Sequence, residues 1–367
     1  MNTSLRPARA IAPGRIILRE LEARGWSQQD LAAILGRPEQ MVSEIIQAKK
    51  QISAETARQL ARAFGTSPEL WMNLEAQYRL LLAEKGENEG EIERRSILYN
   101  FAPVNELIKR GWIHFSNSMD ELEKEVCRFF QISSIGDRPQ VLASYRVSAE
   151  RGPEERAKIA WVCRVKQLAA AQPVKDYRPE RMPEFILKLL AFTNQETDVS
   201  NVPELCIEYG IHFLFVPHLP KSYLDGAALW LEGHPVIALS LRYDRLDYFW
   251  FTVLHEIAHI YTQNQDVHLD QLFDLKEAQV EQDEIQANQL AIQWLLNEED
   301  LREFIELNHP RYSRFAITSF GEKHNRHPGI IVGQLMYRGE MKYSTLREYL
   351  VKVRPYLQAW EDVSYPA

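Results

Sequence analysis

The chain has few cysteines and no long hydrophobic run. Only Cys127, Cys163 and Cys206 occur in 367 residues, and no two of them form a CxxC pair. This scatter argues against a disulfide framework and a cysteine-ligated metal site, and it favours buried free thiols in a reducing cytosol. The first thirteen residues lack the apolar core of a signal peptide, and no apolar run is long enough to span a bilayer. These absences predict a cytoplasmic protein without membrane contact.

The chain is long enough for more than one domain, and its charge is unevenly distributed. With 45% hydrophobic residues, 367 residues can fill separate cores. Residues 1–80 carry 11 Lys and Arg against 8 Asp and Glu, a net charge of +3, whereas the whole chain carries −8 and the remainder therefore −11. A basic module on an acidic body indicates one nucleic-acid-binding face in the first 80 residues.

The most informative segment is His255-Glu256-Ile257-Ala258-His259. Chance alone predicts on the order of 0.03 such H-E-x-x-H matches in a chain of this composition. Histidines four residues apart lie on one face of a helix and can point at one metal ion, while Glu256 can take a proton from a water that the metal activates. Apolar residues at helical spacing around the motif predict a buried helix. The alternative interpretation is a pair of hydrogen-bonded core histidines.

A third metal ligand is expected on a second helix, in residues 281–296. Glu284 and Asn288 lie four residues apart on one face of this helix. The carboxylate can therefore bind the metal while the amide hydrogen-bonds a histidine ligand from behind. Glu281 is the alternative ligand. The helix dipole, which favours negative charge in a first turn, also explains acids at this position.

The stretches around these motifs resemble the ImmA/IrrE family of zinc metallopeptidases. The likeness covers residues 222–300 and is carried by Leu224–Trp230, Val236–Leu239 and Phe249–His259. In this family the helix that supplies the third ligand typically has the sequence E-x-E-A-N-x-F-A. Residues 284–291 follow this pattern with Gln286 in place of the second Glu. The resemblance implies a Zn²⁺ site of His255, His259 and Glu284, with Glu256 as the catalytic base. It also implies a substrate class, helix-turn-helix repressors that are cut at one peptide bond.

Two further features would complete such a site. Peptide hydrolysis usually needs a donor that stabilises the oxyanion, and the sequence leaves His327, His324 and Tyr223 as alternatives. Residues 227–231 and 236–240, separated by Glu232–Pro235, predict a β-hairpin. The edge of this hairpin could hold a peptide substrate by strand addition.

The first 80 residues predict a five-helix module that contains a helix-turn-helix. Ser27 is a typical N-cap with Asp30 three residues later, and the apolar periodicity that follows ends at Gly36. A second short helix, residues 39–46, comes directly afterwards. Two helices joined by a tight glycine turn are typical of DNA-binding proteins. Flanking helices are predicted over residues 14–24, 54–64 and 68–80.

Residues 13–80 resemble HigA-type antitoxins of the Xre class. The likeness is carried by Ser43–Ser53 and Leu60–Leu74, with Gln47-Ala48-Lys49 where the family more often has Asn-Gly-Lys. Glutamine and serine on the second helix would reach base edges, and the basic residues would contact the phosphate backbone. The alternative is a helix-turn-helix used for dimerisation or protein contact. The predicted DNA-binding residues are Gln28, Arg37, Gln40, Ser43, Lys49 and Lys50.

Together these patterns predict a mostly α, multidomain protein, in which an all-α helix-turn-helix domain precedes an α+β zincin-like metallopeptidase domain. The expected segments are residues 1–82, a helical linker at 83–195, the peptidase at 196–305 and a helical region at 306–367. The predicted function is a homodimeric regulator that binds promoter or operator DNA and cleaves a repressor or antitoxin-type protein with zinc. The alternative is a non-catalytic antitoxin-like repressor whose zincin fold senses a ligand or binds a toxin.

Overall fold

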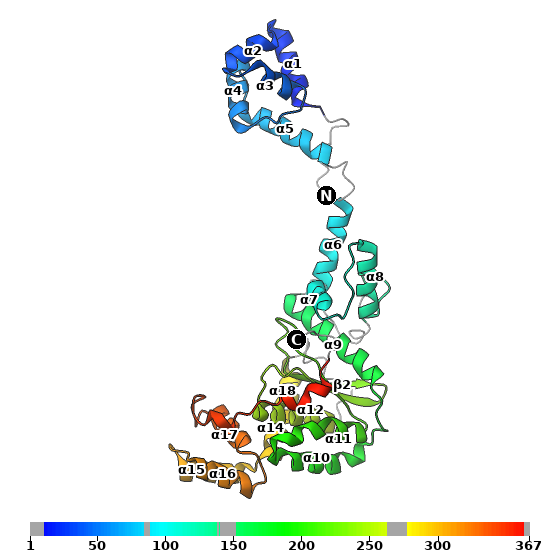
Figure 1. The fold of residues 1–367 in the computed structure, drawn as a ribbon, viewed down its shortest axis with the longest axis vertical. Coiled ribbons are helices and arrows are strands. Elements are labelled where there is room, and N and C mark those ends of the chain that lie inside the picture. The colour runs from blue at the N-terminus through cyan, green and yellow to red at the C-terminus, as the bar shows by residue number, and fades with distance from the viewer. Residues whose placement is uncertain (1–10, 84–88, 138, 140–151, 263–276, 363–367) are drawn as a thin grey trace. The chain divides into compact units, whose positions relative to one another are not determined.

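The computed structural model describes residues 11–83, 89–137, 139, 152–262 and 277–362. The chain divides into two units, Met1–Arg94 and Arg95–Ala367, and each is described by itself (Figure 1). Both are mostly helical, which confirms the predicted multidomain, mostly α class. The finer division at residues 82, 195 and 305 stays a prediction. No described helix is both long enough and apolar enough to cross a membrane.

The described part of the first unit folds into five helices whose ends follow the predicted capping signals. Ser27 and Asp30 form a capping box, in which each side chain accepts a hydrogen bond from the other's backbone N–H, at 3.1 and 2.7 Å. Gly36 ends the same helix with a φ of 64°, a conformation that favours glycine. Leu31 and Trp71 are fully buried in the core. The helices are α1 (Pro13–Arg24), α2 (Gln28–Leu35), α3 (Glu39–Ile46), α4 (Ala54–Phe64) and α5 (Pro68–Ala83).

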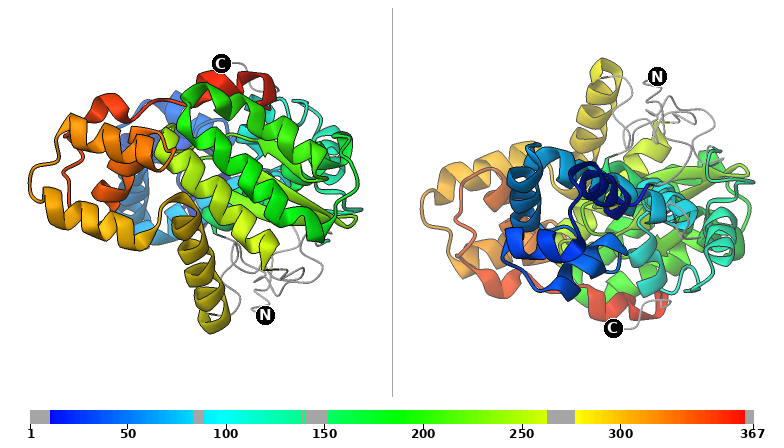
Figure 2. Two further views of the ribbon diagram at one scale, coloured as in Figure 1. Left: turned by 90° about the horizontal axis from the view of Figure 1, so that it is seen from below. Right: turned by 90° about the horizontal axis from the view of Figure 1, so that it is seen from above.

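The second unit is built around a small sheet of three described strands. The strand order is β1 (His212–Phe215), β3 (His234–Leu239), β2 (Gly226–Leu231), with β1 parallel and β2 antiparallel to β3. Helices pack on both faces of the sheet (Figure 2). The helices of this unit extend from Glu89 to Leu357, and α6 begins in the first unit. They are α6 (Glu89–Phe101), α7 (Val104–Lys109), α8 (Met119–Phe130), α9 (Pro153–Ala171), α10 (Met182–Ala191), α11 (Val202–Glu208), α12 (Leu246–Tyr261), α14 (Glu277–Leu295), α15 (Glu298–Asn308), α16 (Arg314–Lys323), α17 (Pro328–Tyr337) and α18 (Arg354–Leu357).

The two faces of the sheet pack into different cores because side chains alternate along each strand. Ala228 and Ile237 belong to the core that contains α10, α11, α12 and α17. Ala227 and Val236, their neighbours in sequence, belong to the core that contains α8 and α9. The sheet is therefore a middle layer, and α12 lies across one of its faces against β2 and β3.

The predicted hairpin is present, but its turn is shorter than the expected four residues. Leu231 pairs with His234, so only Glu232 and Gly233 connect the strands. Both have positive φ, 50° and 85°, as a two-residue type I′ turn requires. His234 and Pro235 therefore lie in β3 rather than in the loop.

The two outer edges of the sheet differ. Along β1, the chain near the C-terminus adds a parallel bridge between Phe215 and Glu361, and Asp362 donates its backbone N–H to Phe215 O at 2.9 Å. The carboxylate of Asp362 also receives hydrogen bonds from Arg164 at 2.7 and 2.8 Å and from Trp112 Nε1 at 3.0 Å. Along β2, no further strand pairs with the outer edge in the described residues. The open edge is thus the one that faces α12.

Candidate metal centre

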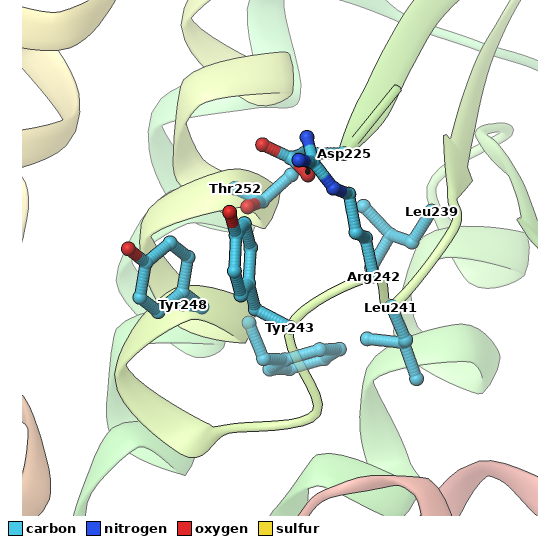
Figure 3. Close-up of a pocket in the computed structure, with 8 residues that line it drawn as sticks. Asp225, Leu239, Leu241, Arg242, Tyr243, Tyr248 and Thr252 are labelled. Atoms are coloured by element: carbon cyan, nitrogen blue, oxygen red, sulfur yellow. Dashed lines mark ion pairs between the residues drawn. The ribbon is translucent and has the colours of Figure 1, made fainter. Parts of the chain in front are cut away.

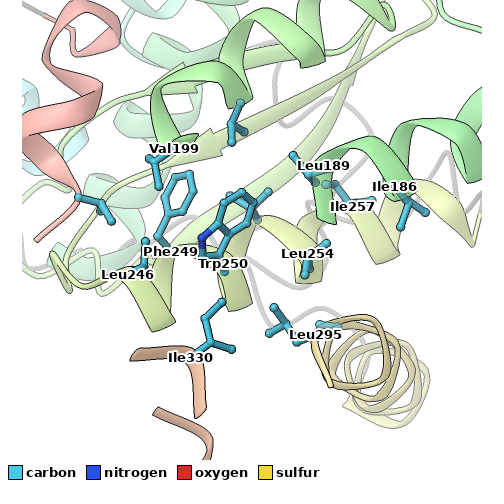
Figure 4. Close-up of a cluster of buried hydrophobic side chains, with 14 of the residues drawn as sticks. Ile186, Leu189, Val199, Leu246, Phe249, Trp250, Leu254, Ile257, Leu295 and Ile330 are labelled. Carbon is cyan, nitrogen blue, oxygen red and sulfur yellow. The ribbon is translucent and has the colours of Figure 1, made fainter. Parts of the chain in front are cut away.

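Helix α12 is oriented by a broad apolar surface on one side. Trp250, Leu254 and Ile257 are fully buried in the core beneath the helix (Figure 4). Burial of these side chains is worth about 1.5–3 kcal/mol each, which fixes the rotation of the helix about its axis. As a result, His255 and His259 both project toward a cleft between α12, β2 and α14.

The ligand atoms of His255, His259 and Glu284 converge on one point. The two Nε2 atoms are 3.0 Å apart, and the Glu284 carboxylate oxygens lie 3.2 Å from His255 Nε2 and 3.5 Å from His259 Nε2. Ligands of a tetrahedral zinc ion at its usual bond lengths of about 2.0–2.1 Å stand roughly 3.3 Å apart. The three measured distances bracket this value, so the side chains present fit a zinc ion without rearrangement. Among the described residues these three form the group whose ligand atoms all lie within 4.8 Å.

Asn288 orients the first of these histidines. His255 donates from Nδ1 to Asn288 Oδ1 at 3.1 Å. This contact fixes the tautomer with a hydrogen on Nδ1 and leaves the lone pair of Nε2 directed into the convergence point. Glu284 and Asn288 act from one face of α14, at the spacing that the sequence predicted.

Glu284 and Glu256 have opposite pKa shifts. Burial alone would raise the pKa of Glu284, but hydrogen bonds to His255 and His259 outweigh it and hold that pKa well below its usual range. Burial raises the pKa of Glu256, and the nearby histidines offset this only in part. Carboxylates whose environments push their pKa values apart are typical of acid–base sites. The arrangement places a carboxylate that is held ionised, Glu284, near a buried carboxyl whose pKa is raised, Glu256.

Glu256 is held between α12 and the edge strand. Its side chain is buried, and its carboxylate accepts a hydrogen bond from the backbone N–H of Ala228 in β2. Gly226 lies so close that a Cβ atom there would stand 2.8 Å from Glu256 Oε1. Only glycine therefore allows the strand and the carboxylate this approach.

The cleft beside the convergence point has a volume of about 400 Å³. Residues 226–228 of β2 form one wall and α12 forms the other, with Tyr248, Phe251 and Thr252 in addition to the motif. In a small neighbouring pocket that shares Asp225, Tyr248 and Thr252 with the cleft, Arg242 lies over the ring of Tyr243 and 3.8 Å from Asp225 (Figure 3). The same guanidinium also lies over the ring of Tyr223.

In the first unit, the structure describes all six residues predicted to bind DNA. Gln40, Lys49 and Lys50 are exposed, and Ser43 is half-buried on α3. Gln40 donates to Glu44 Oε1 at 3.0 Å, and Ser43 Oγ accepts from Gln47 at 3.1 Å.

The remaining two of the six are half-buried. Arg37 donates to Gln59 Oε1 at 3.2 Å and forms an ion pair with Glu55, so it also joins the turn between α2 and α3 to α4. Gln28 stands at the start of α2.

Comparison with known proteins identifies both parts of the chain. A family model described as helix-turn-helix matches residues 17–71, and a peptidase family model described as the IrrE N-terminal-like domain matches residues 206–319. The chain joins a helix-turn-helix domain to an IrrE N-terminal-like domain. The first matched range contains α3, and the second contains His255, His259 and Glu284, the three residues of the convergence point.

Two relatives match segments about as long as the helix-turn-helix domain. Virulence-associated protein I of Dichelobacter nodosus is 36% identical over 77 residues, which are 21% of this chain and 71% of that protein. Virulence-associated protein A' of the same organism is 39% identical over 69 residues, 18% of this chain and 60% of that protein.

Solved structures match a segment of similar length. They include an addiction module antidote protein of the HigA family from Coxiella burnetii, 38% identical, and Pseudomonas aeruginosa antitoxin HigA with higBA promoter, 37% identical. Each alignment covers 23% of this chain and 92% of the other, with a TM-score of 0.22.

Of the three alternatives for an oxyanion donor, Tyr223 lines the cleft of the IrrE-like domain and His324 and His327 do not. His324 Nδ1 lies 3.9 Å from Asp300, and His327 caps α17 by accepting the backbone N–H of Gly329 at 3.0 Å. The side chain of the alternative ligand Glu281 lies outside the described residues.

Four cleft residues were missed in the sequence. Tyr248, Phe251 and Thr252 precede His255 by seven, four and three positions, so helical spacing could have found them. Gly226 has no local signal, because its role depends on a contact between β2 and α12.

Proposed function

We propose that the protein is a DNA-binding regulator whose IrrE-like domain is a zinc-dependent endopeptidase. The observation that carries the proposal is the convergence of three ligand atoms beside a buried carboxylate at the wall of an open cleft. A protein that only bound a partner would need neither a buried Glu256 nor the glycine that accommodates it.

The reaction would divide the work among the four side chains. Zinc held by His255, His259 and Glu284 would polarise the scissile carbonyl and acidify the attacking water. Glu256 would accept the proton of that water and deliver it to the leaving amine, because it is buried beside the convergence point and burial raises its pKa, which makes it a stronger base. Tyr223, the oxyanion alternative that lines the cleft, could donate to the developing charge.

The substrate would bind in an extended conformation against β2. An edge strand offers unpaired backbone N–H and C=O groups, and β2 presents such an edge at the cleft. Residues 226–228 line the cleft and have small side chains or none, so a peptide backbone could approach the outer edge of β2 there. Main-chain pairing would bring a carbonyl of the bound peptide toward the convergence point.

The helix-turn-helix domain would bring the endopeptidase to its substrate at DNA. A homodimer of the first unit would bind operator DNA through α3, with Gln40 and Ser43 toward base edges and Lys49 and Lys50 toward phosphates. The substrate would be a helix-turn-helix repressor or antitoxin-type protein acting at the same operator. Cleavage of that protein would switch transcription of the genes it controls.

The test compares two glutamate variants of the zinc-loaded full chain. Glu256→Gln should keep one equivalent of zinc and lose about 10²–10⁴-fold in cleavage of a quenched-fluorescence decapeptide library, the usual contribution of a general base. Glu303→Gln, which changes an exposed carboxylate on α15, should cut as the wild type does. Undiminished cutting by Glu256→Gln would refute the assigned base. If neither the wild type nor Glu303→Gln cuts, and Glu256→Gln regulates its promoter normally, the non-catalytic repressor is the correct function.

A further inference from the structure

A second pocket opens beside the cleft of the IrrE-like domain. We call it the side pocket, and its volume is about 140 Å³. Tyr248 and Phe251 line both the cleft and the side pocket, so the two are neighbours. The ring of Phe251 lies 6.0 Å from the ring of His255. Because an extended chain advances about 3.3 Å per residue, a side chain that enters here belongs to a residue within about two positions of the bond at the convergence point.

The size and lining of the side pocket suit one large side chain. Pockets for whole small molecules begin at about 300 Å³, twice the volume present here. Phe251, Leu295 and Ile330 supply apolar walls from three helices, and Figure 4 shows the last two approaching α12 from α14 and α17. An apolar or aromatic side chain would lose its water contact between these walls.

One polar group in the wall has unused hydrogen-bonding capacity. Gln334 on α17 lines the side pocket and is 7% exposed, and its Oε1 atom is buried without a hydrogen-bond partner among the described residues. An occupant of the pocket therefore bonds this amide only when the amide group turns toward the pocket. The charged groups of the wall, Arg245 and Asp247, satisfy each other through contacts of 2.7 and 3.1 Å. A buried amide oxygen without a partner is costly, so an occupant that bonds with it is favoured over one that does not.

We propose that the side pocket is a specificity subsite that binds a tyrosine side chain next to the scissile bond of a peptide substrate. The apolar walls take the ring, and the amide of Gln334 bonds the phenol hydroxyl. A hydroxyl can donate to the amide oxygen or accept from its nitrogen, so it suits either orientation of the amide, whereas tryptophan can only donate. The inference rests on the proposed function, because it takes the cleft to bind peptides.

The test replaces the amide while keeping the shape of the pocket. The zinc-loaded wild type and Gln334→Leu are given the same decapeptide library, and the cut positions are identified by mass spectrometry. The wild type should favour tyrosine over phenylalanine at one position beside the cut by about tenfold, the worth of one good hydrogen bond. Gln334→Leu should lose this preference and cut phenylalanine peptides within about twofold of the wild-type rate. Equal preferences in the two proteins would overturn the proposal.

A binding measurement separates failure of the subsite from failure of the peptidase. Saturation-transfer NMR compares N-acetyl-tyrosine amide with N-acetyl-phenylalanine amide on the wild type, on Gln334→Leu and on Gln289→Leu, a control on α14 at an exposed glutamine outside the side pocket. The subsite is supported if the wild type and Gln289→Leu bind the tyrosine amide more tightly than the phenylalanine amide and Gln334→Leu does not. This result supports the subsite even if the protein cuts no peptide. Equal binding of the two amides to the wild type contradicts it, even if peptides are cut.

Discussion

Replacing Gly226 with alanine would test how strictly the position of Glu256 controls the proposed reaction. The new Cβ atom would stand 2.8 Å from Glu256 Oε1, 2.8 Å from Thr252 Cγ2 and 3.3 Å from the backbone oxygen of Ala238. Ordinary contact begins at 3.4 Å, so β2 and α12 must separate by about 0.6 Å or the carboxylate must turn away. Gly226 does not have a positive φ, so alanine causes only this steric conflict.

The expected size of the effect follows from what holds Glu256 in place. Its carboxylate cannot turn freely, because it accepts a hydrogen bond from the N–H of Ala228 and is buried. Overpacking of this kind costs about 1–3 kcal/mol of unfolding free energy. A catalytic group displaced by about 1 Å can lose 10²-fold in rate. Gly226→Ala should therefore cut about 10²-fold more slowly and unfold more easily, with its zinc content unchanged because the three ligands lie on α12 and α14.

The assay measures peptide cleavage, zinc content by mass spectrometry and urea unfolding on the same preparations. Gly90→Ala is the matched control, because a Cβ atom at Gly90 in α6 meets no atom within 4 Å. Alanine in a helix is favoured over glycine by about 0.5–1 kcal/mol, so the control should be slightly more stable and fully active. If Gly226→Ala has wild-type rate and stability, the close contact between β2 and Glu256 does not exist in solution.

Three further predictions concern other parts of the chain. Glu284→Ala should lose its bound zinc without unfolding, whereas Gln286→Ala, an exposed change on the same helix, should keep it; zinc retained by both would remove Glu284 from the site. Lys50→Ala should weaken binding to all DNA sequences equally and lower the salt slope by about one, whereas Gln40→Ala should lower the preference for the selected operator by about 1–3 kcal/mol; anisotropy titrations at several salt concentrations distinguish the two effects. Burial, helped by the charge of His234, lowers the pKa of His212 to about 4. Because the unfolded chain binds this proton near pH 6.5, stability falls as pH drops from 6.5 toward 4, and urea unfolding should show the wild type losing about 2 kcal/mol more than His212→Phe between pH 7.5 and 5.

What could be predicted from the sequence depended on how local the signals are. Ser27 and Gly36 mark the start and the end of α2 through contacts within one helical turn, and the structure confirms these helix ends. The spacing of His255 and His259 likewise requires only the helix that carries them. The parallel pairing of β1 with β3 had no such signal, because its partners lie more than twenty residues apart and are joined through β2. The covering of β1 by residues 361 and 362 is more remote still.

The residues of the candidate metal centre and those of the proposed subsite also differ in how far apart they lie in the sequence. The convergence point and Glu256 lie on α12 and α14, inside residues 206–319, where the IrrE N-terminal-like domain matches. Gln334 and Ile330 lie on α17, beyond that range, and reach the side pocket only because α17 packs against α12. Gly333 makes this packing possible, since a Cβ atom there would stand 2.4 Å from Asp247 Oδ2. If the side pocket is a subsite, residues of the IrrE N-terminal-like domain carry out hydrolysis, and α17, which follows that domain, selects the peptide. The motifs of the family do not include α17 and therefore do not indicate this selectivity.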